Sequence, residues 1–262
     1  MNFNRPNQII NIVKEAAIDK ASKSNKQLAL LALLGGAYIA LGSIFAVIVA
    51  GALPGLSETN PGLVKLLFGL TFPLGFVLVT LAGAELFTST TAIMSVGVFS
   101  GVTPLSKLVK VWSFSYLGNF VGALIVVYFL APQSKIFSGA MYSEFIYNIA
   151  ENKLSNNFFT TFVKGIGANW LVCLAAFLTY SSKDVVGKIF ALWAPVTAFV
   201  AMGFEHSIAN MFFIPMAKAL GANILWSSFL LDNLLPVTLG NIVGGVIFVA
   251  FIYSVIYGEK KN

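Results

Sequence analysis

Two short polar segments interrupt long apolar runs of this sequence, and each of them carries a glutamate. Residues 83–91 read GAELFTSTT, and residues 203–210 read GFEHSIAN. The glutamates, Glu85 and Glu205, each follow a glycine by two positions and lie 120 positions apart (205 minus 85). An ionisable side chain at the centre of a bilayer costs on the order of 3 kcal/mol, so it indicates a functional site. We therefore expect one site in a membrane, a pore or carrier built from two halves.

The residue types in both segments suit a small anion. A helix that ends in mid-membrane presents free backbone N–H groups and the positive end of its dipole to a ligand. Thr88, Ser89 and Ser207 add hydroxyl donors. Asn210 adds an amide donor. Neither segment contains lysine or arginine. This favours a weakly held monovalent anion, as rapid permeation requires.

The only histidine of the chain, His206, lies in the second segment. Its imidazole can donate a hydrogen bond to a passing anion or exchange a proton with it. Ionised Glu85 and Glu205 would repel an anion that they faced. We expect both carboxylates to turn away and accept hydrogen bonds from the N–H groups of their own loops, with Asn210 in the same loop-shaping group. One histidine and scattered carboxylates do not form a metal-ligand set, so we expect no metal and no cofactor.

Large apolar side chains flank both segments. They are Phe72 and Phe76 before the first segment, Leu86 and Phe87 within it, and Phe199 before the second. Hydrophobic constrictions beside a polar centre would exclude hydrated ions and pass a species that sheds water or takes up a proton. Because the chain has 24 phenylalanines, packing in the core or against lipid explains any one of these residues equally well.

The composition places these segments in a helical membrane protein. Of the 262 residues, 58% are hydrophobic and 10% are charged, and the mean hydropathy is +0.86. The apolar runs predict an all-α fold of six membrane spans. The predicted spans are 28–52, 63–100, 105–131, 157–181, 189–218 and 234–257. The second and fifth are too long for one straight helix, so we expect each to be two half-helices joined at its polar segment.

The third and sixth predicted spans carry a repeated motif. GNFVGA begins at Gly118, and GNIVGG begins at Gly240, 122 positions later (240 minus 118). Both contain Gly-x-x-x-Gly, a spacing that lets two membrane helices touch, and packing alone explains these glycines. We expect Asn119 and Asn241 to bond to neighbouring helices. Because each half has three spans, the second half is inverted relative to the first, which places a substrate path between the halves.

Residues 1–27 predict an amphipathic cytoplasmic helix that precedes the membrane domain of residues 28–262. Asn4, two positions before Pro6, marks its expected start. Apolar residues then recur at helical spacing, namely Ile9, Ile10, Val13, Ala17 and Ala21. A solvated tail is the alternative interpretation.

The basic residues predict the orientation in the membrane. If the N-terminus is cytoplasmic, five of the 16 Lys and Arg residues fall outside, namely Lys65, Lys135, Lys153, Lys164 and Lys218. This distribution satisfies the positive-inside rule and puts both termini in the cytoplasm. The formal net charge of +6 therefore needs no nucleic-acid partner.

Four segments resemble the formate/nitrite transporter family, and the resemblance covers nearly the whole chain. They are residues 83–90, 169–175, 203–211 and 236–241. Residues 210–216 and 232–236 are more similar to the formate channels. Residues 36–38 and 169–172 are more similar to the nitrite branch, which leaves the sub-branch open.

The resemblance implies a homopentamer of aquaporin-like subunits, each an inverted 3+3 repeat with its own anion path. It implies that Leu86, Phe87 and Thr88 form a mobile loop at the pore centre, opposite His206. It also implies that the N-terminal helix gates the path in a pH-dependent way.

The resemblance also assigns residues along the path. The implied constriction residues are Phe72, Phe76, Val172 and Phe199. Formate channels often carry leucine at the position of Phe76, so the width of this constriction differs. Lys153 and Asn169 match polar residues that attract and orient the anion.

We therefore expect a channel or proton-linked carrier in the lipid of a bacterial inner membrane. Formate is the first candidate substrate, with nitrite and hydrosulfide as alternatives. A neutral-solute pore is a rival, but both polar segments lack the Asn-Pro-Ala motif and the filter arginine of aquaporins. A membrane enzyme is the other rival. Ser207 is adjacent to His206, but neighbours on a helix do not face each other and no activating group is evident, so we expect no enzyme.

Overall fold

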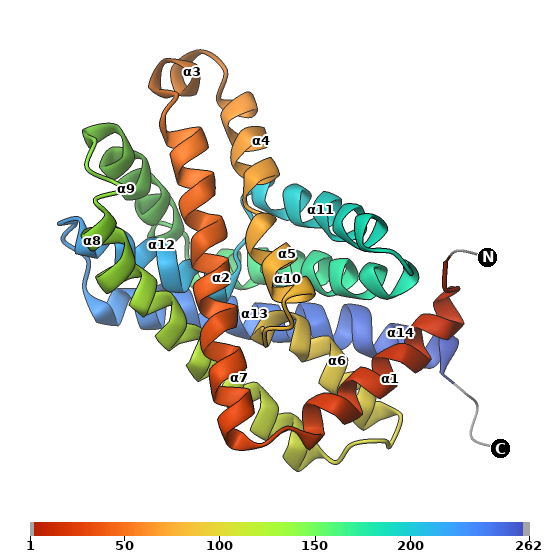
Figure 1. Cartoon of the computed structure of the whole chain (residues 1–262). Helices are drawn as coiled ribbons and strands as arrows, with labels where there is room; N and C mark the ends of the chain where they lie inside the picture. The colour runs from red at the N-terminus through yellow and green to blue at the C-terminus, as the bar shows by residue number, and fades with distance from the viewer. Residues whose placement is uncertain (1–2, 259–262) are drawn as a thin grey trace.

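The computed structural model describes residues 3–258, which form helices and loops with one isolated bridge, between Phe3 and Ser182 (Figure 1). The α-helices are α1 (Pro6–Ser22), α2 (Asn25–Gly51), α3 (Pro54–Thr59), α4 (Pro61–Thr71), α5 (Leu74–Leu81), α6 (Phe87–Phe99), α7 (Leu105–Ile125), α8 (Ala131–Ser134), α9 (Ala140–Leu154), α10 (Phe158–Ser181), α11 (Val185–Ala201), α12 (Ser207–Ala219), α13 (Leu235–Gly245) and α14 (Ile252–Tyr257). The π-helical segments are η1 (Val126–Leu130), η2 (Ser228–Leu234) and η3 (Val246–Phe251). The ends of the predicted N-terminal helix and cytoplasmic C-terminus, residues 1–2 and 259–262, lie outside the described residues.

Five helical stretches of the described chain are long and apolar enough to cross a membrane. They are Asn25–Gly51, Pro61–Leu81, Leu105–Ser134, Phe158–Ser181 and Ser228–Tyr257. The first four correspond to the first four predicted spans, although the second prediction also included α6. The fifth stretch corresponds to the sixth prediction. The predicted span 189–218 consists of α11 and α12, which are both shorter because the chain leaves the helix between them.

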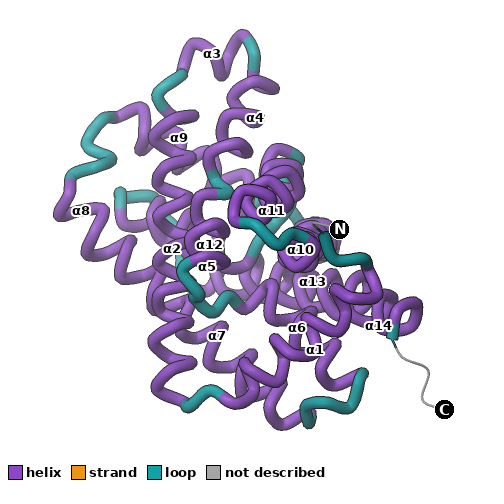
Figure 2. Tube along the Cα trace, turned by 45° about the vertical axis from the view of Figure 1, so that its right-hand side comes forward, coloured by secondary structure: helices purple, strands orange, loops and turns teal. Residues whose placement is uncertain are grey.

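Two pairs of long helices pack closely along each other (Figures 1 and 2). α7 packs along α2, and α13 packs along α10. A Cβ atom on Gly122 of α7 would collide with the carbonyl oxygen of Leu33 in α2. One on Gly240 of α13 would collide with the carbonyl oxygen of Phe162 in α10. The Gly-x-x-x-Gly motifs therefore bring the two backbones of each pair into contact, as their spacing predicts.

The N-terminal helix α1 packs on α6, α10 and α14 at one end of the molecule (Figure 1). Its buried residues are Ile9, Ile10, Val13, Ala17 and Ala21, the five that the helical spacing indicated. The predicted start was wrong by one residue, since Arg5 and not Asn4 is the N-cap. Asn4 instead donates to the Tyr180 carbonyl at 2.8 Å and fastens the start of α1 to α10.

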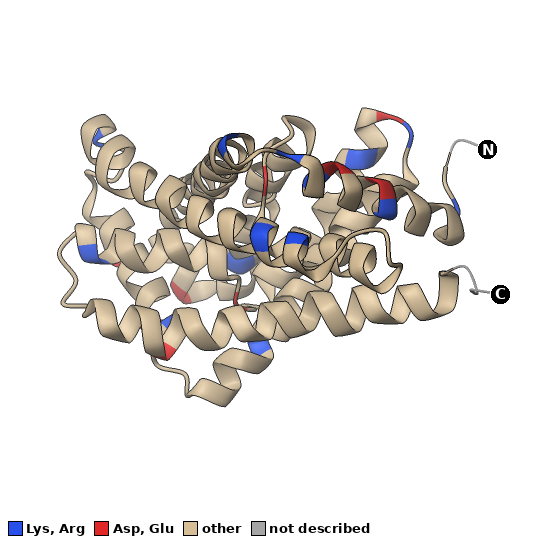
Figure 3. Ribbon diagram, turned by 90° about the horizontal axis from the view of Figure 1, so that it is seen from below, with Lys and Arg blue, Asp and Glu red and all other residues tan. Residues whose placement is uncertain are grey.

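The sequence patterns did not predict α3 or α9. α9 fully buries only Ile146 and Ala150, and polar residues alternate with its apolar ones, so it has no long apolar run. Charged residues are sparse elsewhere, and Figure 3 shows long stretches of helix without any. The importance of α9 lies in its last turn, which contains Lys153.

Candidate functional site

Both polar segments leave the preceding helix in the same way. Gly83 after α5 and Gly203 after α11 have positive φ angles of 80° and 69°. The N–H of the next residue donates to the carbonyl five positions earlier, at 2.9 Å for Ala84 and 3.1 Å for Phe204. This is the Schellman ending of a helix, and it favours glycine because other L-residues are strained at positive φ. It explains the glycine in both Gly-x-Glu motifs.

A buried asparagine fixes the backbone after the first helix end. The side-chain oxygen of Asn119, in α7, accepts the Phe87 N–H at 2.9 Å. Its amide nitrogen donates to the carbonyls of Glu85 at 2.8 Å and Ala32 at 2.7 Å. Asn119 therefore satisfies a free amide at the start of α6 and ties the segment to α2.

Asn241 makes the same set of bonds in the second half. Its side-chain oxygen accepts the Ser207 N–H at 2.9 Å. Its amide nitrogen donates to the carbonyls of Glu205 at 2.9 Å and Gly165 at 2.8 Å. Both asparagines bond to neighbouring helices, as expected, and both also hold the irregular backbone.

Lysines bind the two carboxylates, which differs from the expectation that their own loop amides would do so. Lys20 Nζ lies 2.8 Å from both oxygens of Glu85. Lys153 Nζ lies 3.0 Å from Glu205. Among the described residues, neither carboxylate accepts a loop N–H. The asparagines bind the Phe87 and Ser207 amides, and carbonyls of neighbouring helices bind the amides of the two glutamates.

A polar side chain five positions later supports each carboxylate. The Thr90 hydroxyl donates to Glu85. The Asn210 amide donates to Glu205 at 2.6 Å. Asn210 thus binds the carboxylate of the segment in which it was expected to act.

The two segments meet at Thr88 and His206, which are both buried. Nε2 of His206 lies 2.9 Å from the Thr88 hydroxyl oxygen. Nδ1 accepts the Ala209 N–H at 3.1 Å and so caps α12. Because Nδ1 is an acceptor, the neutral ring carries its proton on Nε2 and donates it to Thr88. The hydroxyl hydrogen of Thr88 is then available to an anion.

Asn169 lies under the start of α6 and is fully buried. Its amide nitrogen donates to the Thr88 carbonyl at 3.2 Å and to the Thr91 hydroxyl at 2.9 Å. It also bonds to the Asn241 carbonyl. Three protein acceptors already share its two N–H groups, so this arrangement suits it to holding Thr88 in place.

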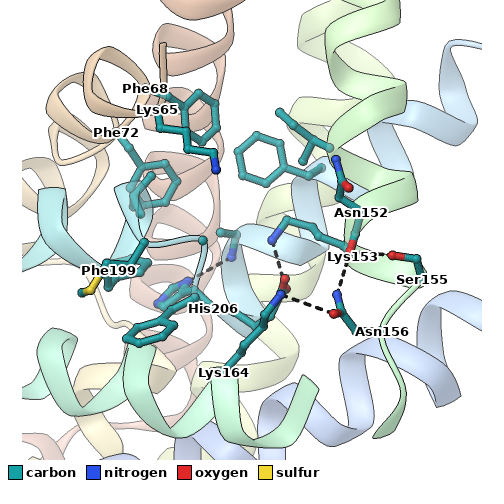
Figure 4. A pocket seen from close by; sticks show the side chains of 18 residues that line it. Lys65, Phe68, Phe72, Asn152, Lys153, Ser155, Asn156, Lys164, Phe199 and His206 are labelled. Atoms are coloured by element: carbon teal, nitrogen blue, oxygen red, sulfur yellow. Dashed lines mark hydrogen bonds and ion pairs between the residues drawn. The ribbon is translucent and has the colours of Figure 1, made fainter. Parts of the chain in front are cut away.

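A cavity of about 440 Å³, here called the His206 cavity, opens beside the second segment (Figure 4). Its charged lining residues are Lys65, Lys153, Lys164 and Glu205, and His206 lies at its wall. The Lys65 side chain extends into it from α4 (Figure 4). Three ammonium groups against one carboxylate give this cavity a positive charge that attracts anions.

A second cavity of about 270 Å³, here called the Lys20 cavity, lies beside the first segment. Its charged lining residues are Lys20, Lys23, Lys188, Asp19 and Glu85. α1 supplies Lys20 and Asp19, and therefore forms one wall of the cavity. Each cavity thus contains one of the two lysine–glutamate pairs.

Aromatic rings line both cavities. Phe72 and Phe199 contact each other edge to face at the His206 cavity, with ring centroids 6.0 Å apart. The Phe199 ring also stacks on His206 at 5.7 Å. Phe76 lines the Lys20 cavity. The structure therefore brings three of the four predicted constriction residues to the cavity walls.

The other apolar residues of the predicted path are buried and line neither of these two cavities. Leu86 and Val172 belong to the hydrophobic core. The Phe87 ring packs on Tyr116 of α7, with centroids 4.8 Å apart. Leu86 lies two positions before Thr88, while Phe87 contributes to packing on α7.

Sequence reasoning missed Lys20 as a site residue. The sequence alone does not connect it with its partner Glu85, which lies 65 positions away. One signal was present, because Lys20 lies three positions after the buried Ala17 and hence beside the buried face of α1.

Long apolar helices around a buried polar pair, with a cation-lined cavity at each polar segment, define a helical membrane protein of the transport class. The described residues contain no cluster of three or more His, Cys, Asp or Glu that could hold a metal.

Comparisons with known proteins identify the family. A family model described as formate/nitrite transporter matches residues 7–255, so the chain belongs to the formate/nitrite transporter family. A probable formate transporter of Methanothermobacter thermautotrophicus is 43% identical over 243 residues, covering 87% of each chain. A solved FNT family ion channel superposes with a TM-score of 0.85 at 28% identity, covering 95% of this chain and 98% of its own. A pentameric formate channel with formate bound gives 0.78 at 35% identity, covering 90% and 98%.

Proposed function

We propose that this protein is a channel or proton-linked transporter for small monovalent anions, with formate as its principal substrate. The observation that carries the proposal is the buried Thr88–His206 pair, 2.9 Å apart, which joins the two polar segments. The relatives with formate in their names support the choice of formate. Nitrite and hydrosulfide are the alternative substrates, because the same donors serve any small monovalent anion.

The proposed architecture is an inverted 3+3 repeat of six spans, in which α11 and α12 together form the fifth. The matching bonds of Asn119 and Asn241 support this repeat. The proposed assembly is a homopentamer, as in the pentameric relative. We place it in a bacterial cytoplasmic membrane, surrounded by lipid, with both termini in the cytoplasm. α1 then covers the cytoplasmic Lys20 cavity and gates it.

The proposed path runs from one cavity to the other through the polar pair. Lysines attract the anion into the His206 cavity, where Lys153 is bound at the wall. The anion loses water between Phe72 and Phe199 and accepts a hydrogen bond from the Thr88 hydroxyl as a replacement, while His206 Nε2 donates to the Thr88 oxygen. Asn169 keeps Thr88 in position. The anion leaves through the Lys20 cavity when α1 moves.

Stopped-flow flux into proteoliposomes tests the proposal between pH 5 and pH 8. We expect formate movement well above that of protein-free liposomes, and slower movement of nitrite or hydrosulfide. Movement of none of the three anions at any pH would refute the proposal. Faster nitrite or hydrosulfide would reassign the principal substrate, and urea or glycerol movement without anion movement would indicate a neutral-solute pore.

His206→Asn tests the part played by the imidazole in the same assay. Asparagine retains an oxygen that can cap α12, but it cannot protonate in this pH range. We expect the pH dependence of formate flux to disappear. An unchanged pH profile would remove His206 from that role.

A further inference from the structure

The π-helical segment η2 brings a second buried amide to the lysine–glutamate pair of the His206 cavity. Asn233 lies in η2, is fully buried and is not among the residues that line the cavity. π-helical turns often occur at functional sites because they redirect side chains. The bonds of Asn233 indicate which group it serves.

Asn233 connects two elements that hold the ion pair. Its amide nitrogen donates to the carbonyl oxygen of Lys153 at 3.0 Å. Its amide oxygen accepts from Asn210 at 2.7 Å. The Lys153 carbonyl belongs to the last turn of α9, where carbonyls have no partner within the helix. Asn233 therefore caps α9 at the residue whose side chain enters the cavity.

The bonds close into a ring. Asn210 donates to Asn233 and also to the Glu205 carboxylate, at 2.6 Å. Glu205 accepts the Lys153 ammonium at 3.0 Å. Lys153 thus belongs to the ring twice, through its backbone carbonyl and through its ammonium. A ring that holds both ends of a long side chain limits the positions that its charge can occupy.

The ion pair of the Lys20 cavity lacks this ring. Thr90 supports Glu85 there, in place of the amide of Asn210. The position that matches Asn233 at the repeat spacing of 122 is the apolar Val111 (233 minus 122). In the described chain, no side-chain amide bonds to the Lys20 backbone or to the Glu85 carboxylate. The two ion pairs are therefore held differently.

We propose that Asn233 is a positioning residue for Lys153. It fixes the lysine backbone at the end of α9 and, through Asn210, the carboxylate that the ammonium binds. The ammonium therefore stays at one place on the wall of the His206 cavity, where arriving anions meet it. The last step rests on the proposed function, whereas the positioning itself does not.

Chemical labelling tests the positioning without any measurement of transport. The purified protein and its Asn233→Leu variant are treated briefly with acetic anhydride, and acetylation of each lysine is followed by peptide mass spectrometry. We expect acetylation of Lys153 to become about threefold to tenfold faster, the factor that one lost hydrogen bond gives. Lys65 and Lys164, which line the same cavity, are the internal controls and should keep their rates. An unchanged Lys153 rate overturns the proposal.

Asn233→Leu leaves the Lys153 carbonyl and the Asn210 amide without their partner. A second variant therefore controls for misfolding. Asn233→Ser is smaller and retains a donor and an acceptor, and should give a weaker effect of the same sign. Size-exclusion chromatography shows whether each variant keeps its assembly. Equal acceleration at Lys65, Lys164 and Lys153 would indicate general loosening and would also overturn the proposal.

Flux in vesicles of both orientations tests the transport consequence. We expect Asn233→Leu to raise the KM for formate entering from the His206 cavity by about threefold to tenfold, with kcat changed less than about twofold. Entry from the Lys20 cavity should keep its KM. In a Lys153→Met background the added effect of Asn233→Leu should vanish, because the residue to be positioned is gone. An equal effect in both backgrounds contradicts the proposal.

The two tests separate the inference from the proposed function. If the wild-type protein moves no anion while labelling of Lys153 still rises, the proposed function fails and the positioning stands. If the wild-type protein moves formate while both labelling and KM are unchanged in Asn233→Leu, the positioning fails and the proposed function stands.

Discussion

His206 uses both of its ring nitrogens, and this limits what it can do for an anion. Nδ1 caps α12 through the Ala209 amide, so protonation at Nδ1 would break that bond, which contributes about 1 kcal/mol. Nε2 already carries the proton and faces Thr88. In this state the pair offers donors and no positive charge. A donor pair of this kind replaces water around an anion without binding it tightly.

Removal of the Thr88 hydroxyl should slow formate flux. Thr88→Val keeps the shape of the side chain, and a lost hydrogen bond to a charged group costs about 1.5–3 kcal/mol, or roughly tenfold to a hundredfold in rate. Thr88→Ser keeps the hydroxyl and is the matched control, with a rate near that of the wild type. Stopped-flow measurement at equal protein content checks both variants. A wild-type rate in Thr88→Val would exclude the hydroxyl from the path.

Residue types in the sequence indicated Thr88, His206 and both glutamates, because polar groups in apolar runs are conspicuous. The partners of the carboxylates could not be found in this way. Lys20 and Lys153 lie 65 and 52 positions from Glu85 and Glu205. Which lysine meets which glutamate over such distances depends on how α1 and α9 pack.

At the scale of elements, each broken helix depends on one glycine and one asparagine. The glycine ends a helix with a left-handed residue, and the asparagine on a neighbouring helix binds the first amide of the next one. The lengths of the apolar runs predicted the long helices, because a membrane span needs a long and continuous apolar run. This criterion failed for α9, in which only two residues are fully buried.

Gly203→Ala should destabilise the protein by about 1–2 kcal/mol, since alanine is strained in the left-handed region. A Cβ atom on Gly203 would meet no atom within 4 Å, so the effect is one of backbone conformation alone. Gly62→Ala is the control, because its Cβ would also meet nothing within 4 Å and its φ is ordinary. Thermal unfolding in detergent measures both. Equal unfolding temperatures would contradict the role of the left-handed turn.

At the scale of the whole molecule, an ion pair between Lys20 and Glu85 binds α1 to the first polar segment. Glu85 is 2% exposed, and Lys20 is its only cationic partner among the described residues. Removal of one member of a buried pair leaves an uncompensated charge, which is costly. The position of α1 is therefore linked energetically to the first polar segment.

Lys20→Met should loosen α1 and lower stability by about 3–5 kcal/mol, or less to the extent that water reaches the lysine. Hydrogen–deuterium exchange should rise in α1 and around residues 82–86. Lys20→Met combined with Glu85→Gln should recover most of the loss, because the buried charge is then absent. Lys14→Met is the control, since Lys14 bonds to Asn11 of its own helix. Equal exchange in the Lys14 and Lys20 variants would contradict this link.

The bonds at the centre also bear on how the molecule can move. Thr88 and Asn169 belong to different halves of the chain, and the Thr88 carbonyl accepts from the Asn169 amide. Tyr116 and Thr238 join α7 to α13 at 2.9 Å. Rocking one half as a rigid body against the other would break these bonds together with the Thr88–His206 pair. Small movements of α1 or of single side chains would break few of them. In the proposed transport function, opening one end of the molecule would therefore disturb fewer bonds than tilting one half.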